Sequence, residues 1–304
     1  NKIFINGLVY VNTVVHSPSN SKYIRFTVNY QNSNVDYATT TQLELGETAT
    51  SYEPYQEYTN DMVVTKRENH TLYAMWEKKE STFIAGPEFN AKIKQLAGNE
   101  DATYTTSDIN ITSIQRTNTL PEIELTDNNI VSTDDSNTPI YVWYDNGTIY
   151  YYSEALNPEL NRNSDSMFRN IKNVVDIDLN TINTSYTIAL SNFFNGCTNL
   201  KNINIETFKT TNVTQMNAMF QYCESLTSLD LSSFELVNLK LTNDFFKNVN
   251  SLQELKTPSI YPSDTNITID LPKTMYDASN NEYTTLGSGS PTETLLKDTQ
   301  TVAE

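Results

Sequence analysis

The stretch that decides the fold runs from Phe208 to Phe234 and reads FKTTNVTQMNAMFQYCESLTSLDLSSF. Its apolar positions stand every three residues from Phe220 to Leu229, and the next one, Leu231, follows after two. Three-residue spacing places side chains on one face of a helical or 3₁₀ turn, whereas alternation is typical of a strand. The stretch therefore predicts one turn of a coil with a helix-like side and a strand side.

The same pattern recurs with a period of 26 residues, and the copies share five apolar columns. The columns are Phe168, Phe194, Phe220 and Phe246; Ile171, Cys197, Cys223 and Val249; Val174, Leu200, Leu226 and Leu252; Ile177, Ile203, Leu229 and Leu255; and Leu179, Ile205, Leu231 and the polar exception Thr257. One copy cannot bury its inner face alone, but stacked copies can. The predicted structural core comprises Phe168, Phe194, Phe220, Phe246, Cys197, Cys223, Leu200, Leu226, Leu229 and Leu231.

These residues resemble the BspA-type bacterial leucine-rich repeat. Phe208 to Cys223 is similar to the recurrent S-F-x-T-S-x-V-T-x-M-x-x-M-F-x-x-C of that family, and Leu229 to Phe234 to its L-D-L-S-S-F. Pro139 to Tyr152 is similar to the hairpin that often precedes such arrays, and Leu271 to Asp277 to the closing segment. The resemblance covers about half the chain. It implies an α/β leucine-rich-repeat solenoid over 139–287, with a short helix plus a short strand in each coil.

The first and fourth copies depart from that family pattern. Ile171 and Val249 replace the cysteine, and Leu236-Val237-Asn238 replaces the T-S-N that precedes the fourth copy. Such substitutions are typical of terminal copies, which often diverge from the repeat pattern.

Residues 81–138 predict an entry cap of one helix and a strand. Pro87 suits a first helical turn, and Gly98 suits a helix end. Between them Phe89, Ile93 and Leu96 share one face. A strand is expected around Ile109, Ile111 and Ile114. The cap would cover the end of the coil, which must be shielded from solvent.

The N-terminal region is predicted to be mostly β. Residues 1–57 alternate as strands do, and Gln42 to Tyr55 resembles the ending of carbohydrate-binding-like β-sandwiches, so we interpret 1–57 as the C-terminal part of such a domain. Met62 to Thr65 and Thr71 to Trp76, within 58–80, resemble the close of an internalin-type B-repeat. Residues 288–304 are small and polar and are predicted to be a linker or tail.

The charge and the apolar content of the sequence exclude some classes of binding partner. The formal net charge of −17 repels phosphate backbones and argues against electrostatic docking onto anionic lipid, so nucleic acid is not an expected partner. No apolar run approaches the roughly 20 residues that a membrane span requires, so direct membrane insertion is not expected either. The first residue is not methionine, and we interpret the sequence as a piece of a longer or processed chain. With two cysteines the chain is no disulfide scaffold, and the redox state of Cys197 and Cys223 stays open.

The sequence offers no recognisable catalytic constellation. His16 and His70 are the only histidines, and both stand in polar surroundings. No zinc-protease, phosphate-loop or nucleophile-elbow motif is present. We therefore predict no enzyme activity, catalytic residue, cofactor or bound metal; Asp176-x-Asp178 and Asp134-Asp135 are weak calcium candidates.

Binding is the predicted activity. The outward side chains of the strand side would form a polar ladder, and repeat proteins commonly bind ligands on such faces. Its candidate residues are Asn202, Asn204, Ser228 and Asp230. The resemblance implies an extracellular adhesion or ligand-binding region at a bacterial cell surface, with a host or neighbouring-cell protein or glycan as partner. A phage tail or receptor-binding structural protein, and an accessory module of a secreted enzyme, are the alternatives.

Overall fold

The computed structural model describes residues 23–28, 41–45, 70–75 and 80–300. The chain divides into two compact units, Asn1–Lys78 and Lys79–Glu304. In the first unit β1 (Tyr23–Val28) pairs antiparallel with both β2 (Thr41–Leu45) and β3 (His70–Met75). Because β3 pairs with β1, the segments predicted as 1–57 and 58–80 share one sheet. His16, Met62 to Thr65, and the part of the Gln42 to Tyr55 tract after Leu45 lie outside the described residues.

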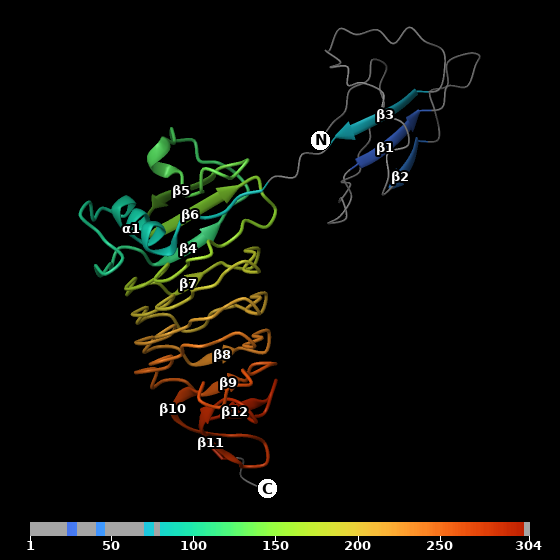
Figure 1. The fold of residues 1–304 in the computed structure, drawn as a ribbon. Helices are drawn as coiled ribbons and strands as arrows, with labels where there is room; N and C mark the ends of the chain where they lie inside the picture. Colours follow the sequence, from blue (N-terminus) through green and yellow to red (C-terminus); the bar gives the residue numbers. More distant parts are fainter. Residues whose placement is uncertain (1–22, 29–40, 46–69, 76–79, 301–304) are drawn as a thin grey trace. The chain divides into compact units, whose positions relative to one another are not determined.

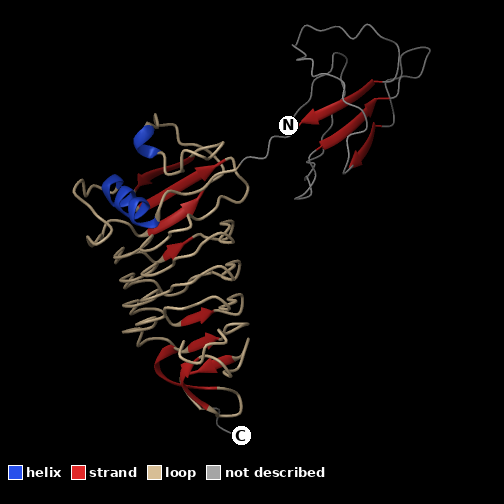
Figure 2. Ribbon diagram, in the orientation of Figure 1, coloured by secondary structure: helices blue, strands red, loops and turns tan. Residues whose placement is uncertain are grey.

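The second unit contains two mixed sheets and one α-helix among its described residues (Figures 1 and 2). The hairpin sheet has the order β5-β6-β4-β7 and the terminal sheet the order β11-β10-β12-β9-β8. In chain order the elements are α1 (Gly86–Leu96), β4 (Ser113–Arg116), the 3₁₀ turn η1 (Asp127–Asn129), β5 (Ile140–Asp145), β6 (Thr148–Ser153), β7 (Asp176–Ile177), β8 (Ser228–Asp230), β9 (Glu254–Lys256), β10 (Ile269–Tyr276), β11 (Glu282–Leu286) and β12 (Leu295–Lys297).

Segments 26 residues apart stack on one another from the hairpin sheet to the terminal sheet, and they include β7, β8 and β9 (Figure 1). Parallel bridges link Asn163 to Ala189, Ala189 to Gln215, and Gln215 to Leu241, and we call the four segments that begin at these residues layers 1 to 4. The rings of Phe168, Phe194, Phe220 and Phe246 follow one another at centroid distances of 5.8, 5.3 and 5.9 Å. The ten residues predicted as structural core are all buried.

The predicted α/β leucine-rich-repeat solenoid is nevertheless wrong, because the repeats contain no helix. The only α-helix of the described residues is α1, which lies outside the layers. On the strand side β7, β8 and β9 form, but 201–205 does not form a strand. The second unit is therefore a sheet-rich fold and does not have a helix and a strand in every repeat.

The backbone explains why the three-residue spacing does not produce helices. Each layer carries two residues with positive φ, four positions apart, and such residues interrupt a right-handed helix. These residues are Ser166 and Asn170, Asn192 and Gly196, Ala218 and Tyr222, and Asp244 and Asn248. Alternate amides donate to the following layer instead of to their own turn; those of Phe168 and Phe194, for example, donate to Phe193 and Met219 at 2.9 Å. Apolar periodicity indicates which side chains face inward, but it does not determine the backbone conformation. In this protein turns, and not helices, place these side chains in the core.

Helix α1 covers the carbonyl edge that layer 1 presents. The amide of Gly86 donates to Asn163 O at 2.9 Å, and Asn90 Nδ2 donates to the carbonyls of Met167 and Arg169 at 3.2 and 3.0 Å. Lys94 Nζ also donates to Arg169 O, at 2.7 Å. The three donors are spaced by four residues and share one helix face. A Cβ at position 86 would meet the backbone of Ser164, so glycine permits this close approach.

The hairpin β5–β6 and the C-terminal residues complete the sheets. Asn146 and Gly147 both have positive φ at the turn, as a two-residue hairpin requires. The prediction of a linker or tail over 288–304 is wrong for its central part. There β12 pairs with β9 and β10, because Leu296 alternates inward and is fully buried. In the entry cap β4 starts at Ser113, so Ile109 is exposed and lies outside the strand.

Replacing Leu229 by alanine should lower the free energy of unfolding by about 2 to 5 kcal/mol, because it removes buried methyl groups between layers. Leu229 is buried, whereas the neighbouring Ser228 is half-buried and points outward. Ser228→Ala should therefore cost less than about 1 kcal/mol. Chemical denaturation of both variants provides the measurement. A larger loss for Ser228→Ala would show that the assigned inward and outward positions are reversed.

Candidate binding face

The four predicted binding residues lie on two adjacent layers. Asn202 and Asn204 are exposed, and Ser228 and Asp230 are half-buried on β8. Ser228 Oγ donates to Asn202 Oδ1 at 2.9 Å, which joins the two layers. Asn204 does not contact Asp230 by a hydrogen bond; its Nδ2 donates to Asn180 Oδ1 at 2.9 Å, in the preceding layer.

Charged pairs extend this face toward the C-terminus. Lys256 Nζ lies 3.3 Å from Asp230 Oδ2, and Lys297 Nζ lies 3.1 Å from Glu254 Oε1. Partial burial raises the pKa of Asp230, but hydrogen bonds from Ser232 and the ammonium of Lys256 outweigh it, so the pKa lies below its usual value. Asp230 therefore stays charged and held in place at neutral pH.

Toward the N-terminus the face continues into the hairpin sheet. Ser113 on β4 is in register with Asp176 on β7 and with Thr148 on β6. Gln115 Nε2 donates to Asp176 Oδ2 at 2.6 Å and to Ser113 Oγ at 2.8 Å. We use the name ladder face for the outward side chains of β5, β6, β4 and β7 together with 202–204, β8 and β9.

The sequence reasoning missed the aromatic part of the ladder face. Tyr141, Trp143, Tyr150 and Tyr152 alternate with the buried Val142 and Tyr151 along β5 and β6. That alternation is visible in the sequence and indicates that these four side chains point away from the core. Of the four, Tyr150 lies beside Gln115, because it is the register partner of Gln115 on β6.

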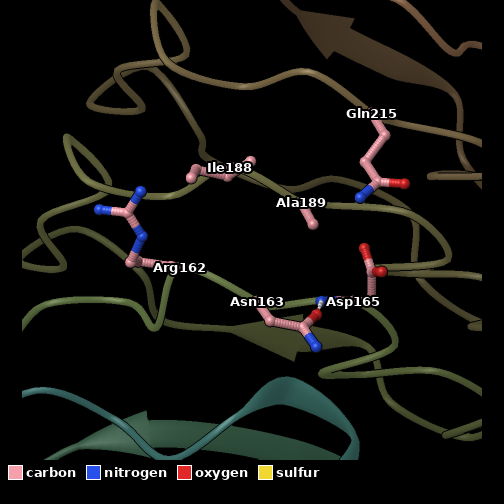
Figure 3. A pocket seen from close by; sticks show the side chains of 6 residues that line it. All are labelled: Arg162, Asn163, Asp165, Ile188, Ala189 and Gln215. Atoms are coloured by element: carbon pink, nitrogen blue, oxygen red, sulfur yellow. Dashed lines mark hydrogen bonds between the residues drawn. The ribbon is translucent and has the colours of Figure 1, made fainter.

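A shallow, open hollow of about 310 Å³ lies on another side of layers 1 to 3 (Figure 3). It is lined by Arg162, Asn163, Asp165, Ile188, Ala189 and Gln215. Ala189 is the smallest side chain in the bridged series that runs from Asn163 to Gln215, which leaves space at its position. Burial raises the pKa of Asp165, although its carboxylate accepts the amide of Ser191 at 2.6 Å. The hollow mixes a guanidinium, a carboxyl group and amides without a nucleophile–base pair.

The two cysteines are free and buried in successive layers. Cys197 Sγ donates to Phe168 O at 3.1 Å, and Cys223 Sγ to Phe194 O at 3.2 Å. Burial raises the pKa of the Cys197 thiol to about 12 and that of Cys223 well above its usual value. Neither group is positioned to serve as a thiolate nucleophile.

Both thiols should therefore react slowly with iodoacetamide in the folded protein and rapidly after unfolding. Mass spectrometry of samples quenched over time measures the two rates. Alkylation of folded protein at the unfolded rate would show that this column is accessible to solvent.

In the described part of the chain no group of three or more His, Cys, Asp or Glu side chains could hold a metal ion. Asp176 therefore has no such cluster around it, and neither have Asp134 and Asp135. No described helix has the length and apolarity that a membrane crossing requires.

Comparison with known proteins yields one partial family match. No curated protein and no solved structure matches the chain. Residues 162–281 are similar to a family described as a Mycoplasma protein of unknown function, DUF285. The match covers less than half of the 304 residues and corresponds to the four layers and β10.

Proposed function

We propose that the chain is a non-catalytic binding region exposed at a bacterial cell surface, and that the ladder face carries its ligand. The observation behind this proposal is the joining of outward polar side chains across layers, of which the bond between Ser228 and Asn202 is the central example. Held in place before binding, such groups lose little conformational entropy when a ligand arrives.

The composition of the ladder face supports a role in recognition. Amides, hydroxyls and carboxylates present both donors and acceptors, and repeat proteins commonly bind along such surfaces. Ligand sites need a few fixed polar groups to set orientation, and Gln115, Asn202 and Asp230 are fixed by their neighbours. The family description names Mycoplasma, a bacterial group, which supports the bacterial alternative over the phage one.

The test compares two variants of the full chain that add the same charge at exposed asparagines. Asn202→Arg places a long cation in the middle of the ladder face. Asn243→Arg places the same cation in layer 4, outside the ladder face, at a residue whose backbone carbonyl accepts a hydrogen bond from the amide of Ala218. The fluorescently labelled chain is added to cultured epithelial cells, before and after protease treatment of the cells, and bound fluorescence is measured. We expect saturable binding, at least tenfold weaker for Asn202→Arg and unchanged for Asn243→Arg.

Two outcomes would contradict the proposal. Absence of saturable binding to the cells would remove the adhesion function. Equal binding by Asn202→Arg and the unmodified chain would show that the ladder face is not the surface that binds.

A further inference from the structure

The aromatic end of the ladder face consists of two cross-strand pairs. Trp143 is in register with Tyr150, and Tyr141 with Tyr152. The rings of Trp143 and Tyr150 stack with centroids 5.7 Å apart and planes 22° from parallel. Trp143 is buried, with 8% of its surface exposed, and its ring stacks beside that of Tyr150, while the three tyrosines are half-buried. Three half-buried tyrosines and the buried Trp143 thus share one face of β5 and β6, which we call the platform.

Hydrogen-bonding groups border this platform on the neighbouring strand. Gln115 is the register partner of Tyr150 on β4, and it is held by Ser113 and Asp176. The Tyr150 ring therefore has an aromatic neighbour on one side and a fixed carboxamide on the other. An apolar plane edged by fixed donors and acceptors is complementary to a sugar ring, which has a C–H face and a rim of hydroxyl groups.

The charges around the platform favour uncharged sugars over acidic ones. The carboxylates near the platform are Asp176 beside Gln115 and Asp145 at the end of β5. Lys256 on the ladder face and Lys297 on the adjoining β12 lie at the far end and are paired with Asp230 and Glu254. Arg116, at the end of β4, donates to the carbonyls of Ala155 and Leu156. With a net charge of −17 the chain would also repel a sialylated or sulfated glycan.

We propose that this platform, Tyr141, Trp143, Tyr150 and Tyr152 with Gln115, binds an uncharged oligosaccharide. The inference rests on the proposed function, for which it names the ligand class and the part of the ladder face that binds it. Sugar rings pack against Tyr141 and Tyr152, and Gln115 and Asp176 exchange hydrogen bonds with hydroxyl groups along the rim. Successive rings can extend along the face toward Asn202 and Ser228.

The experiment uses Trp143 as its reporter in the full chain. The only other tryptophan, Trp76, is replaced by phenylalanine, so that fluorescence reports on position 143 alone. Hexasaccharides of glucose, galactose and N-acetylglucosamine serve as uncharged probes, and a galacturonic acid hexasaccharide serves as the acidic one. Tyr152→Ala removes a platform ring, and Tyr186→Ala removes a tyrosine that is 56% exposed in layer 1, outside the platform.

We expect at least one uncharged hexasaccharide to shift Trp143 fluorescence saturably, with affinity at least fivefold weaker in Tyr152→Ala and unchanged in Tyr186→Ala. No saturable shift with any uncharged probe at millimolar concentration would overturn the proposal, as would tighter binding of the acidic probe. Circular dichroism verifies that both variants fold; if Tyr152→Ala does not, Gln115→Ala replaces it with the same expectation. Cell binding that persists without any oligosaccharide response would retain the proposed function and reject only this inference.

Discussion

Replacing Phe220 by alanine should lower the free energy of unfolding by about 3 to 5 kcal/mol. Phe220 is completely buried in the middle of the stack. Its ring lies 5.3 Å from that of Phe194 in layer 2, and 5.5 and 5.9 Å from those of Phe245 and Phe246 in layer 4. The loss is large because the cavity would remove contacts to both neighbouring layers, and a packed core relaxes only partially.

Urea denaturation followed by circular dichroism gives the free energy for Phe220→Ala and for Tyr186→Ala, whose ring is 56% exposed. The control should lose less than about 1 kcal/mol. If both variants lose equally little, the phenylalanine column does not hold the layers together.

The second large effect concerns Lys94 and pH. Lys94 is fully buried, and burial lowers its pKa from 10.5 to about 8, although Asp108 opposes the shift. Between these values the unfolded chain binds more protons than the folded one at this position, so the contribution of Lys94 to stability rises with pH. The full shift corresponds to about 3 kcal/mol between pH 8 and pH 10.5.

The measurement is the free energy of unfolding of the unmodified chain and of Lys94→Met at several pH values in that window. The difference between the two proteins isolates Lys94 from Tyr151, which burial also affects and whose pKa it raises. The advantage of lysine over methionine should grow as pH increases. A difference that is constant or that shrinks would show that Lys94 is not buried as a cation below pH 8.

The register of the repeats could be predicted from the sequence, but the backbone conformation within each repeat could not. A 26-residue period in five apolar columns is a local pattern, and the side chains of those columns are buried except that of Ile203, which is half-buried. The pattern indicates which side chains point inward, but it does not specify the backbone dihedral angles. The positive φ values at Ala218 and Tyr222 could not be read from residue types that rarely adopt them. The helical interpretation failed there.

The candidate binding residues divide in a similar way. Asn202 and Ser228 could be placed on one face because they occupy equivalent positions of successive repeats. The aromatic residues of the platform lie on one hairpin, but the position of Gln115 beside Tyr150 required the pairing of β4 with β6, which joins segments far apart in the chain. The hollow beside Ala189 depends on three layers at once, so no single repeat predicts it.

The carbonyl edge of layer 1 has a consequence for assembly. On the side of the turns, alternate amides of one layer donate to carbonyls of the next, which leaves a row of carbonyl acceptors at layer 1 on that side; on the strand side the amides of Asn199 and Ser225 donate to the preceding layer instead. An open row of acceptors would allow a second molecule to add end to end and polymerise. The backbone amide of Gly86 and the side chains of Asn90 and Lys94 donate to that row, so these acceptors are already occupied. A chain without α1 would thus expose a growth site for filaments at this end.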